Sequence, residues 1–286
     1  MQFSFGWIIK EAQGLIMKVG LGQITCKPGC IEENIQTLIN TILRAADQGC
    51  SVVVLPEVAD VGYAMSKMPK VAGSWDCGAF NAIREIACQT RLHVICGLSE
   101  RVGNNIFNSL AVIDGRGQLI TKYRKIHLID AGTIQESLRF QAGEELVIVS
   151  IGDLMWGLMI CYDLRFPELA RALMCRGADI FVYSSAWPKA RISHWEAMTI
   201  GRAVESQVYV LGANRVGTEE NITFGGCSVA VDPSGVVLAK AGSDEEVLIT
   251  ADISKTRIGT VRNEVPMRSA MRPDLYTKFA RQEQNE

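Results

Sequence analysis

Short runs of strand-forming residues alternate with helical patterns over most of this 286-residue chain. Met17–Gln23 and Ser51–Leu55 are predicted strands, and the apolar residues of 31–46 between them recur at helical spacing until Gly49 ends the pattern. A further helix is expected over Ser74–Arg91. This alternation predicts an α/β protein in which helices cover the faces of sheets.

Two hairpin signals add antiparallel pairing to the predicted sheets. Two strand-like runs between Asn105 and Tyr123 flank Gly115–Gly117, and a second turn signal occupies Asp232–Gly235. Together with the helices, these hairpins favour two mixed sheets packed face to face with the helices outside. The expected architecture is a four-layer αββα sandwich of two mixed β-sheets flanked by helices.

No feature of the sequence divides the chain into separate domains. It contains no linker rich in Pro, Gly or Ser, no low-complexity tract and no repeat of solenoid length. We therefore expect a single domain over 17–286, preceded by an N-terminal extension at 1–16. That extension has Lys10 and Glu11 soon after a brief apolar run and lacks a basic start, so it fits neither a signal peptide nor a membrane span. A cytoplasmic location is the expectation.

Charge and cysteine content indicate which binding partners and which cysteine states to expect for this protein. The net charge of −2, with both signs interspersed, lacks the basic footprint of a nucleic-acid-binding protein. The nine cysteines are odd in number and scattered, so reduced thiols are expected. No HxxxH or CxxC motif occurs, and the Cys26–Cys30 spacing lacks a second ligand pair, so no metal site is expected.

The stretch LMICYDLRFPEL, Leu158–Leu169, combines a strand end, a cysteine and a helix start. The apolar run Met155–Ile160 predicts a buried strand, and Pro167 suits the first turn of a helix expected over Leu164–Arg176. Cys161 is thereby expected at a strand-to-helix turn, where N–H groups and the helix dipole favour the strongly nucleophilic thiolate. The alternative is a buried small side chain with a purely structural role.

A thiol nucleophile needs a base, and the sequence offers histidines and carboxylates. The chain has three histidines, His93, His127 and His194, so their number leaves a Cys–His pair open, although no local signature supports one. Glu57 follows the buried run VVVLP, at the kind of strand end where ligands gather in an α/β sheet, and Lys125 closes another strand-like run. Taken singly, the glutamate could be a solvated loop residue or a helix cap, and the lysine an exposed edge-strand charge.

Three separated blocks together resemble the signature of one enzyme family. LPE at Leu55–Glu57, YRKIHL at Tyr123–Leu128 and ICYDLRFPEL at Ile160–Leu169 are similar, in order and spacing, to the three blocks of the nitrilase superfamily, the carbon–nitrogen hydrolases. The similarity extends from Met17 to Tyr276. The resemblance implies an αββα fold and a hydrolase that requires no metal or cofactor.

The resemblance assigns a role to three side chains. Cys161 is the expected nucleophile, Glu57 the general base, and Lys125 the stabiliser of the tetrahedral intermediate. Burial beside a second acid raises the pKa of a carboxyl and a nearby ammonium lowers it, so their balance decides where the thiol proton resides. The thiolate would attack an amide carbonyl and form a thioester as ammonia leaves, and water would then hydrolyse that thioester.

The family pattern also has a second glutamate between the lysine and the cysteine. Glu136 is the residue most similar to it in position, and Glu144 or Glu145 is the alternative. Next to the nucleophile, Asp163 and Arg165 are expected to form an ion pair that orients the turn.

The blocks are similar to one branch of the superfamily in particular. CYDLRFPEL together with AWPxxRxxHW at Ala186–Trp195 resembles the ω-amidases, which hydrolyse the terminal amide of small dicarboxylic acid monoamides such as 2-oxoglutaramate. Hydrolysis of a nitrile or an N-carbamoyl compound, or a binding role without catalysis, is the alternative. The resemblance further implies a homodimer or larger assembly that pairs through helices beside the nucleophile.

Five residues are expected to contact this substrate. The backbone N–H of Tyr162 would meet the oxyanion, and Tyr63 and Trp187 would line the acyl pocket unless they only pack in the core. Arg165 and Arg191 are the cations expected to bind a substrate carboxylate.

Overall fold

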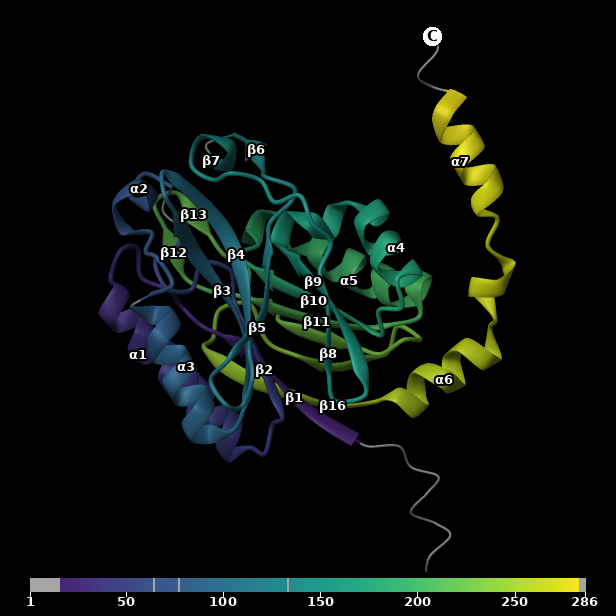
Figure 1. Cartoon of the computed structure of the whole chain (residues 1–286), viewed down its shortest axis with the longest axis horizontal. Coiled ribbons are helices and arrows are strands. Elements are labelled where there is room, and N and C mark those ends of the chain that lie inside the picture. The colour runs from purple at the N-terminus through teal and green to yellow at the C-terminus, as the bar shows by residue number, and fades with distance from the viewer. Residues whose placement is uncertain (1–15, 64, 77, 133, 283–286) are drawn as a thin grey trace, which may run out of the picture.

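The computed structural model describes residues 16–282 except 64, 77 and 133. Two six-stranded mixed β-sheets pack face to face, with helices on both outer faces (Figure 1). The expected four-layer αββα sandwich is confirmed. Of the expected extension at 1–16, only Ile16 lies within the described residues, and it belongs to the first strand.

The first sheet has the strand order β16-β1-β2-β3-β4-β5. Its strands are β16 (Val247–Ser254), β1 (Ile16–Gln23), β2 (Val52–Leu55), β3 (His93–Val102), β4 (Asn105–Ile113) and β5 (Leu119–Arg124). Strands β1, β2 and β3 run parallel, and the other neighbours pair antiparallel. Strands β4 and β5 form the hairpin predicted around Gly115–Gly117.

The second sheet has the strand order β15-β14-β11-β10-β9-β8. Its strands are β15 (Val237–Lys240), β14 (Val229–Val231), β11 (Tyr209–Asn214), β10 (Ile180–Ser185), β9 (Leu154–Ile160) and β8 (Ile148–Ile151). Strands β9, β10 and β11 are parallel, and the remaining pairs are antiparallel. The hairpin predicted around Asp232–Gly235 joins β14 to β15.

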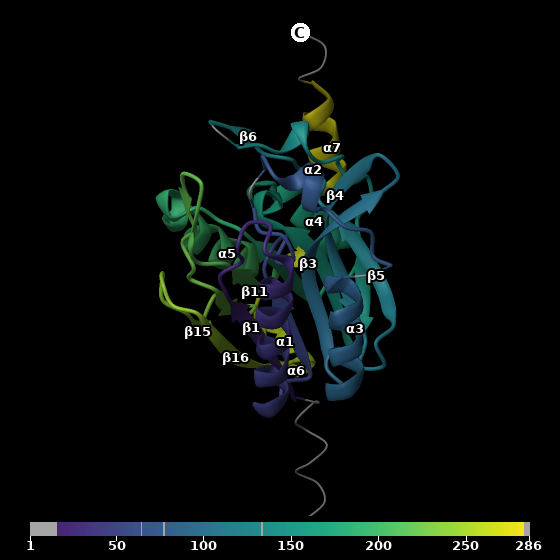
Figure 2. The same cartoon turned by 90° about the vertical axis from the view of Figure 1, so that its left-hand side faces the viewer.

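Crossover helices cover the outer face of each sheet. On the first sheet α1 (Ile31–Asp47) and α3 (Ala79–Thr90) pack against each other, and Figure 2 shows them at the front of the molecule. On the second sheet the covering helices are α4 (Pro167–Cys175) and α5 (Ile192–Ser206). Each of these helices connects two parallel strands, as a crossover connection requires.

Apolar side chains between the two sheets form the central core. Leu21 and Val54 of the first sheet belong to the same buried cluster as Leu158 and Val182 of the second. A separate cluster fills the space under α1 and α3. Strands β2 and β10 are buried along their whole length. Accordingly, β2 and the first four residues of β10 are continuous apolar runs that do not alternate with polar residues.

The remaining elements are short or lie near the C-terminus. They are α2 (Met68–Val71), the small hairpins β6 (Asp130–Ala131) with β7 (Ile134–Gln135) and β12 (Thr218–Glu219) with β13 (Ile222–Thr223), and the 3₁₀ turns η1 (Glu136–Leu138), η2 (Cys161–Arg165), η3 (Lys189–Arg191) and η4 (Met267–Ala270). After β16, α6 (Lys255–Glu264) packs against the sandwich through the buried side chains of Ile258 and Val261, and α7 (Pro273–Gln282) extends beyond it (Figure 1).

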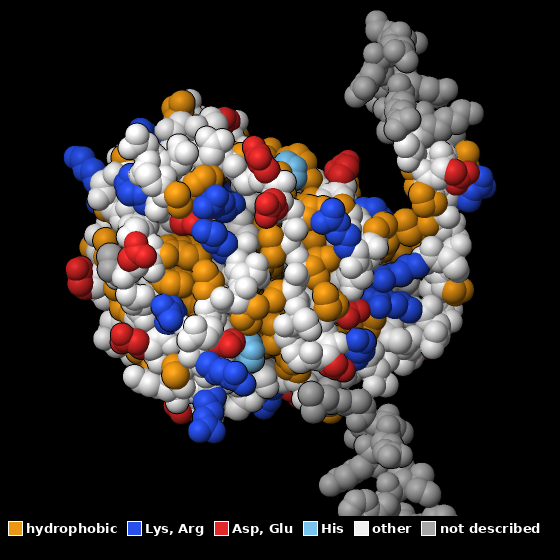
Figure 3. Space-filling model, viewed as in Figure 1, with side chains coloured by type: hydrophobic (Ala, Val, Ile, Leu, Met, Phe, Trp, Pro, Cys, Tyr) orange, Lys and Arg blue, Asp and Glu red, His pale blue; other side chains and the backbone are white. Residues whose placement is uncertain are grey.

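The surface carries charges of both signs, which are interspersed over the face seen in Figure 3. Among the helices of the described residues, none combines the length and the apolar character that crossing a bilayer demands.

Two helix starts differ from the expectation. The helix expected over Ser74–Arg91 begins only after Gly78, whose φ of 63° is incompatible with a helical residue. The helix expected over Leu164–Arg176 begins at Pro167, because Cys161–Arg165 forms a 3₁₀ turn first. The nucleophile candidate therefore lies one short turn before α4 and not at the N-terminus of that helix.

Candidate active site

Three of the predicted site residues follow strands of the two facing sheets. Glu57 comes two positions after β2, Lys125 directly after β5, and Cys161 directly after β9. Because β2 and β9 are buried along almost their whole length, the chain that leaves them starts from a rigid position.

Lys125 lies at the centre of a buried charge cluster. Its Nζ donates to Glu57 Oε1 at 2.8 Å and to Glu136 Oε1 at 2.7 Å. All three side chains are fully buried. A buried ammonium is stable only when it is paired and hydrogen-bonded, and the two carboxylates meet that requirement.

The carboxylate of Glu57 is held at both oxygens. Oε1 also accepts a hydrogen bond from Asn108 Nδ2 at 2.7 Å, and Oε2 accepts the backbone N–H of Ala186 at 2.8 Å. Sequence reasoning did not single out Asn108. The signal in the sequence is a polar residue within the largely apolar run of β4, and the structure shows that Asn108 is buried there.

Glu136 is the second glutamate that the structure brings to Lys125. Its Oε1 also accepts the Tyr63 hydroxyl at 2.6 Å, and its Oε2 accepts the backbone N–H of Ile129 at 2.9 Å. These contacts fix the carboxylate in one orientation.

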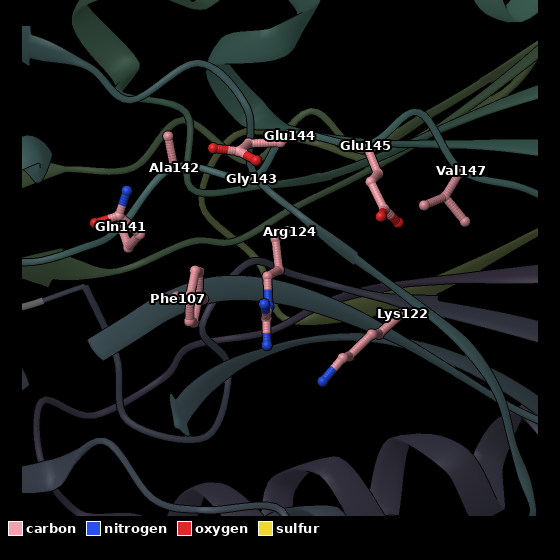
Figure 4. Close-up of a pocket in the computed structure, with 9 residues that line it drawn as sticks. All are labelled: Phe107, Lys122, Arg124, Gln141, Ala142, Gly143, Glu144, Glu145 and Val147. Carbon is pink, nitrogen blue, oxygen red and sulfur yellow. The ribbon is translucent and has the colours of Figure 1, made fainter. Parts of the chain in front are cut away.

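The two alternative glutamates lie elsewhere. Glu144 and Glu145 are exposed and line a separate surface pocket, where Arg124 stacks on Phe107 with its Cζ 3.7 Å from the ring centroid (Figure 4). Neither is among the described hydrogen-bond or ion-pair partners of Lys125.

Cys161 occupies a strained and well-supported turn. Its φ is +44°, in the left-handed region that side chains other than glycine adopt only under constraint. The constraint comes from Asp163, whose Oδ2 accepts the backbone N–H of Ile160 at 2.9 Å and the Tyr123 hydroxyl at 2.7 Å. Hydrogen bonds to the residue before Cys161 and to Asp163 after it therefore hold the turn that carries the sulfur.

The expected ion pair between Asp163 and Arg165 does not form. Asp163 Oδ1 contacts His127, with Nδ1 at 2.8 Å and the backbone N–H at 3.1 Å. Arg165 turns the other way, and its Cζ lies 4.8 Å from the centroid of the Trp187 ring. The backbone of the turn points these two side chains in different directions, which their sequence spacing did not reveal.

Electrostatics define the resting protonation of the cluster. Burial, together with the charge of Glu57, raises the pKa of the Cys161 thiol well above its ordinary value. Burial alone would lower the pKa of Lys125, but the charges of Glu136 and Glu57 outweigh it and raise that pKa. Burial raises the pKa of Glu136, although Lys125 opposes the rise. The resting site therefore holds a neutral thiol beside an ammonium.

A narrow pocket of about 20 Å³ opens beside the sulfur. All five residues expected to contact substrate line it together with Cys161, namely Tyr63, Tyr162, Arg165, Trp187 and Arg191. Apolar contacts come from Ile129 and Ile134. A thiol, an apolar wall and two guanidinium groups therefore line the same space.

The histidines do not take part in this pocket. His127 pairs with Asp163, His194 Nδ1 lies 3.3 Å from Arg165 Nη2, and His93 starts β3. None of them lines the pocket around Cys161. Within the described part of the chain, no cluster of His, Cys, Asp and Glu is arranged to hold a metal ion.

Comparisons with known proteins identify the family. The family model described as carbon-nitrogen hydrolase matches residues 18–263. The chain is 33% identical to the 2-oxoglutaramate amidase of Bacillus subtilis (strain 168), over 79% of this chain and 86% of that protein. It is 34% identical to omega-amidase NIT2 of Bos taurus, over 85% of this chain and 91% of that protein.

A solved structure agrees with this assignment. Saccharomyces cerevisiae Nit3, a member of branch 10 of the nitrilase superfamily, superimposes with a TM-score of 0.81 at 28% sequence identity. The match covers 89% of this chain and 96% of that chain. The chain therefore belongs to the carbon–nitrogen hydrolases of the nitrilase superfamily and is an enzyme of that family.

Proposed function

We propose that this enzyme is a cysteine-dependent amidohydrolase of ω-amidase type, which cleaves the terminal amide of a small dicarboxylic acid monoamide and releases ammonia. One observation carries the proposal. Cys161 lies in a strained turn, and Lys125 is buried in contact with Glu57 and Glu136. The charges of this lysine and these two glutamates affect the pKa of the Cys161 thiol. A nucleophile, a proton acceptor and a fixed positive charge are the groups that acyl transfer requires.

In the first half of the proposed reaction, the thiol becomes a nucleophile as it attacks. Glu57 accepts the proton of Cys161 while the sulfur forms a bond to the amide carbonyl carbon. The negative charge that develops on the carbonyl oxygen is stabilised by the Lys125 ammonium and the backbone N–H of Tyr162. One such donor contributes about 3 kcal/mol, or roughly a hundredfold or more in rate.

In the second half, protonated Glu57 donates its proton to the amide nitrogen. The C–N bond breaks, ammonia leaves, and the acyl group remains on Cys161 as a thioester. Glu57 then accepts a proton from water, which attacks the thioester carbonyl. When that intermediate collapses, the C–S bond breaks, the carboxylic acid is released, and Glu57 returns its proton to the sulfur to restore the thiol.

The two arginines of the pocket support an acidic substrate. Within the described residues, neither Arg165 nor Arg191 forms an ion pair with a carboxylate, although both line the pocket. A substrate carboxylate would supply the missing partner, and Arg is suited to bind it through two hydrogen bonds. The names of the related 2-oxoglutaramate amidase and omega-amidase favour the same substrate class.

The test measures ammonia released from succinamate, 2-oxoglutaramate and the neutral butyramide, together with a short nitrile and an N-carbamoyl acid. Wild type is expected to act on the two acidic amides, and Cys161→Ala to release none. Cys88→Ala is the matched control, because Cys88 is an exposed thiol on α3 and should be dispensable.

Other outcomes of this panel decide between the alternatives. Turnover of only the nitrile or only the N-carbamoyl acid would replace the amidase proposal by the corresponding hydrolase. No release from any compound would support a binding protein on this fold.

The proposal includes a cytoplasmic homodimer. Apolar side chains exposed on α5, Ile200 and Val204, and in the β14–β15 hairpin, Val236, offer a surface that a second copy could cover. The eight cysteines within the described residues are free thiols, in keeping with a reducing compartment. Sedimentation velocity tests the assembly, and a monomer at all concentrations would contradict it.

A further inference from the structure

Arg215 and Glu219 form a buried ion pair outside the pocket. Their side chains are 0% and 3% exposed, and neither lines the space around Cys161. Burying ionised groups costs several kcal/mol for each ion, and apolar replacements for such pairs are often neutral or stabilising. Stability alone therefore does not account for this pair.

Glu219 contacts Tyr63 directly, and Arg215 is connected to Tyr63 through the ring of Phe224. Glu219 Oε2 accepts the backbone N–H of Tyr63 at 2.6 Å. The Arg215 Cζ lies 4.4 Å from the centroid of the Phe224 ring, and that ring meets the Tyr63 ring edge-on with 5.8 Å between centroids. The backbone and the ring of Tyr63 are thus held by one segment, 215–224.

The far end of Tyr63 reaches the charge cluster. Its hydroxyl donates to Glu136 Oε1, the same oxygen that accepts from Lys125 Nζ. If the ring moves away, this carboxylate loses one of the donors that favour its ionised form and hold it against the ammonium. A hydrogen-bonded path therefore connects Glu219 with Lys125 through Tyr63 and Glu136.

We propose that Glu219, supported by Arg215, is a positioning residue that fixes Tyr63 so that the tyrosine hydroxyl holds Glu136 against Lys125. The inference rests on the proposed amidohydrolase function for its kinetic consequence. Glu219 does not line the pocket and acts through the hydroxyl of Tyr63, so we expect its effect to be larger on kcat than on KM.

The test is a double-mutant cycle of Glu219→Gln with Tyr63→Phe. A glutamine amide has one oxygen, which cannot serve both Arg215 and the Tyr63 N–H. We therefore expect kcat to fall about tenfold in the wild-type background, with a smaller change in KM because Tyr63 lines the pocket. In the Tyr63→Phe background the hydroxyl is already gone, and the same substitution should change kcat less than about twofold. Equal factors in both backgrounds would overturn the proposal, as would an unchanged kcat in Glu219→Gln alone.

Two controls keep the cycle interpretable. Glu220→Gln removes the same charge from the next residue, which is exposed and bonds Ser66, and should leave kcat at the wild-type value. If Glu219→Gln does not fold, the same cycle is run with Glu219→Asp. That substitution keeps the charge next to Arg215 but withdraws the carboxylate from the Tyr63 N–H.

A second readout separates this inference from the proposed function. The rate at which iodoacetamide alkylates Cys161, followed by peptide mass spectrometry across pH, reports the state of the cluster without turnover. A shifted pH profile in Glu219→Gln that is absent from the Tyr63→Phe background supports the proposal even if no amide is hydrolysed. An identical profile in all four proteins overturns it, whatever the substrate of the enzyme.

Discussion

The backbone N–H of Ala186 donates to Glu57 Oε2 at 2.8 Å and thereby joins the two sheets at the candidate active site. Glu57 follows a strand of the first sheet, whereas Ala186 directly follows β10 of the second. A second bond, from Ser184 Oγ to the Leu55 carbonyl at 2.8 Å, fastens the same strand ends. The general base of the proposed reaction is therefore positioned by the packing of one sheet on the other.

Gly97→Ala should damage this junction. A Cβ at position 97 would lie 2.5 Å from the Pro56 carbonyl oxygen and 2.6 Å from Glu57 Cα, and both are backbone atoms that cannot rotate away. We expect a loss of about 1–3 kcal/mol in the free energy of unfolding. Activity should fall by up to about a hundredfold, because a displacement of about 1 Å misaligns the base.

The matched control is Gly201→Ala in α5, where an added Cβ meets no atom within 4 Å. The measurement compares thermal unfolding and ammonia release of Gly97→Ala and Gly201→Ala with those of the wild type, using the same preparations for both assays. Wild-type activity in Gly97→Ala would contradict the role given to this close approach.

Lys125→Met should lower kcat by at least about a hundredfold, because the tetrahedral intermediate loses its positive partner. The free energy of unfolding should also fall by about 3 kcal/mol, since Glu57 and Glu136 stay buried without a cation. Lys122→Met on β5 is the comparison, because that lysine pairs with Glu100 away from the pocket. Steady-state kinetics in which the two variants lose activity equally would refute the assignment.

Arg165→Met should alter substrate preference more than it alters the chemical step. Loss of a charged hydrogen bond to the substrate carboxylate should lower kcat/KM for succinamate by about 10- to 100-fold. Butyramide, which has no such carboxylate, should be affected far less. Arg176→Met, an exposed arginine just after α4, provides the control. An equal loss for both substrates would show that this arginine does not select for acid groups.

Glu100 should make stability depend on pH under acidic conditions. Burial alone would raise its pKa, but hydrogen bonds from Arg124, Lys122 and Ser109 outweigh that effect and lower the pKa from 4.5 to about 2. Because the folded pKa lies below the unfolded one, the stabilisation is present above about pH 4.5 and is lost as pH falls toward 2.

The measurement compares thermal midpoints between pH 6 and pH 3. The drop in midpoint should be smaller in Glu100→Gln than in wild type, whereas Glu85→Gln, an exposed change on α3, should keep the wild-type drop. Identical drops in wild type and Glu100→Gln would contradict the prediction.

Much of the fold follows from local patterns in the sequence. The runs at 52–55 and 154–160 are strands because they are apolar throughout, and the Asp232–Gly235 signal makes its hairpin because turn chemistry is set within a few residues. The candidates Glu57, Lys125 and Cys161 could be named for a similar reason, since each stands just after a predicted strand and within a block that resembles the family.

The tertiary structure decided what depends on contacts between distant segments. Glu136 and not Glu144 meets Lys125, Asp163 contacts His127 and not Arg165, and Glu219 reaches Tyr63 across 156 positions of sequence. These contacts depend on how the two sheets stack and on where their connecting loops lie as a result. Periodicity describes which face of one element is buried, but it carries no information about which residue of another sheet will stand opposite.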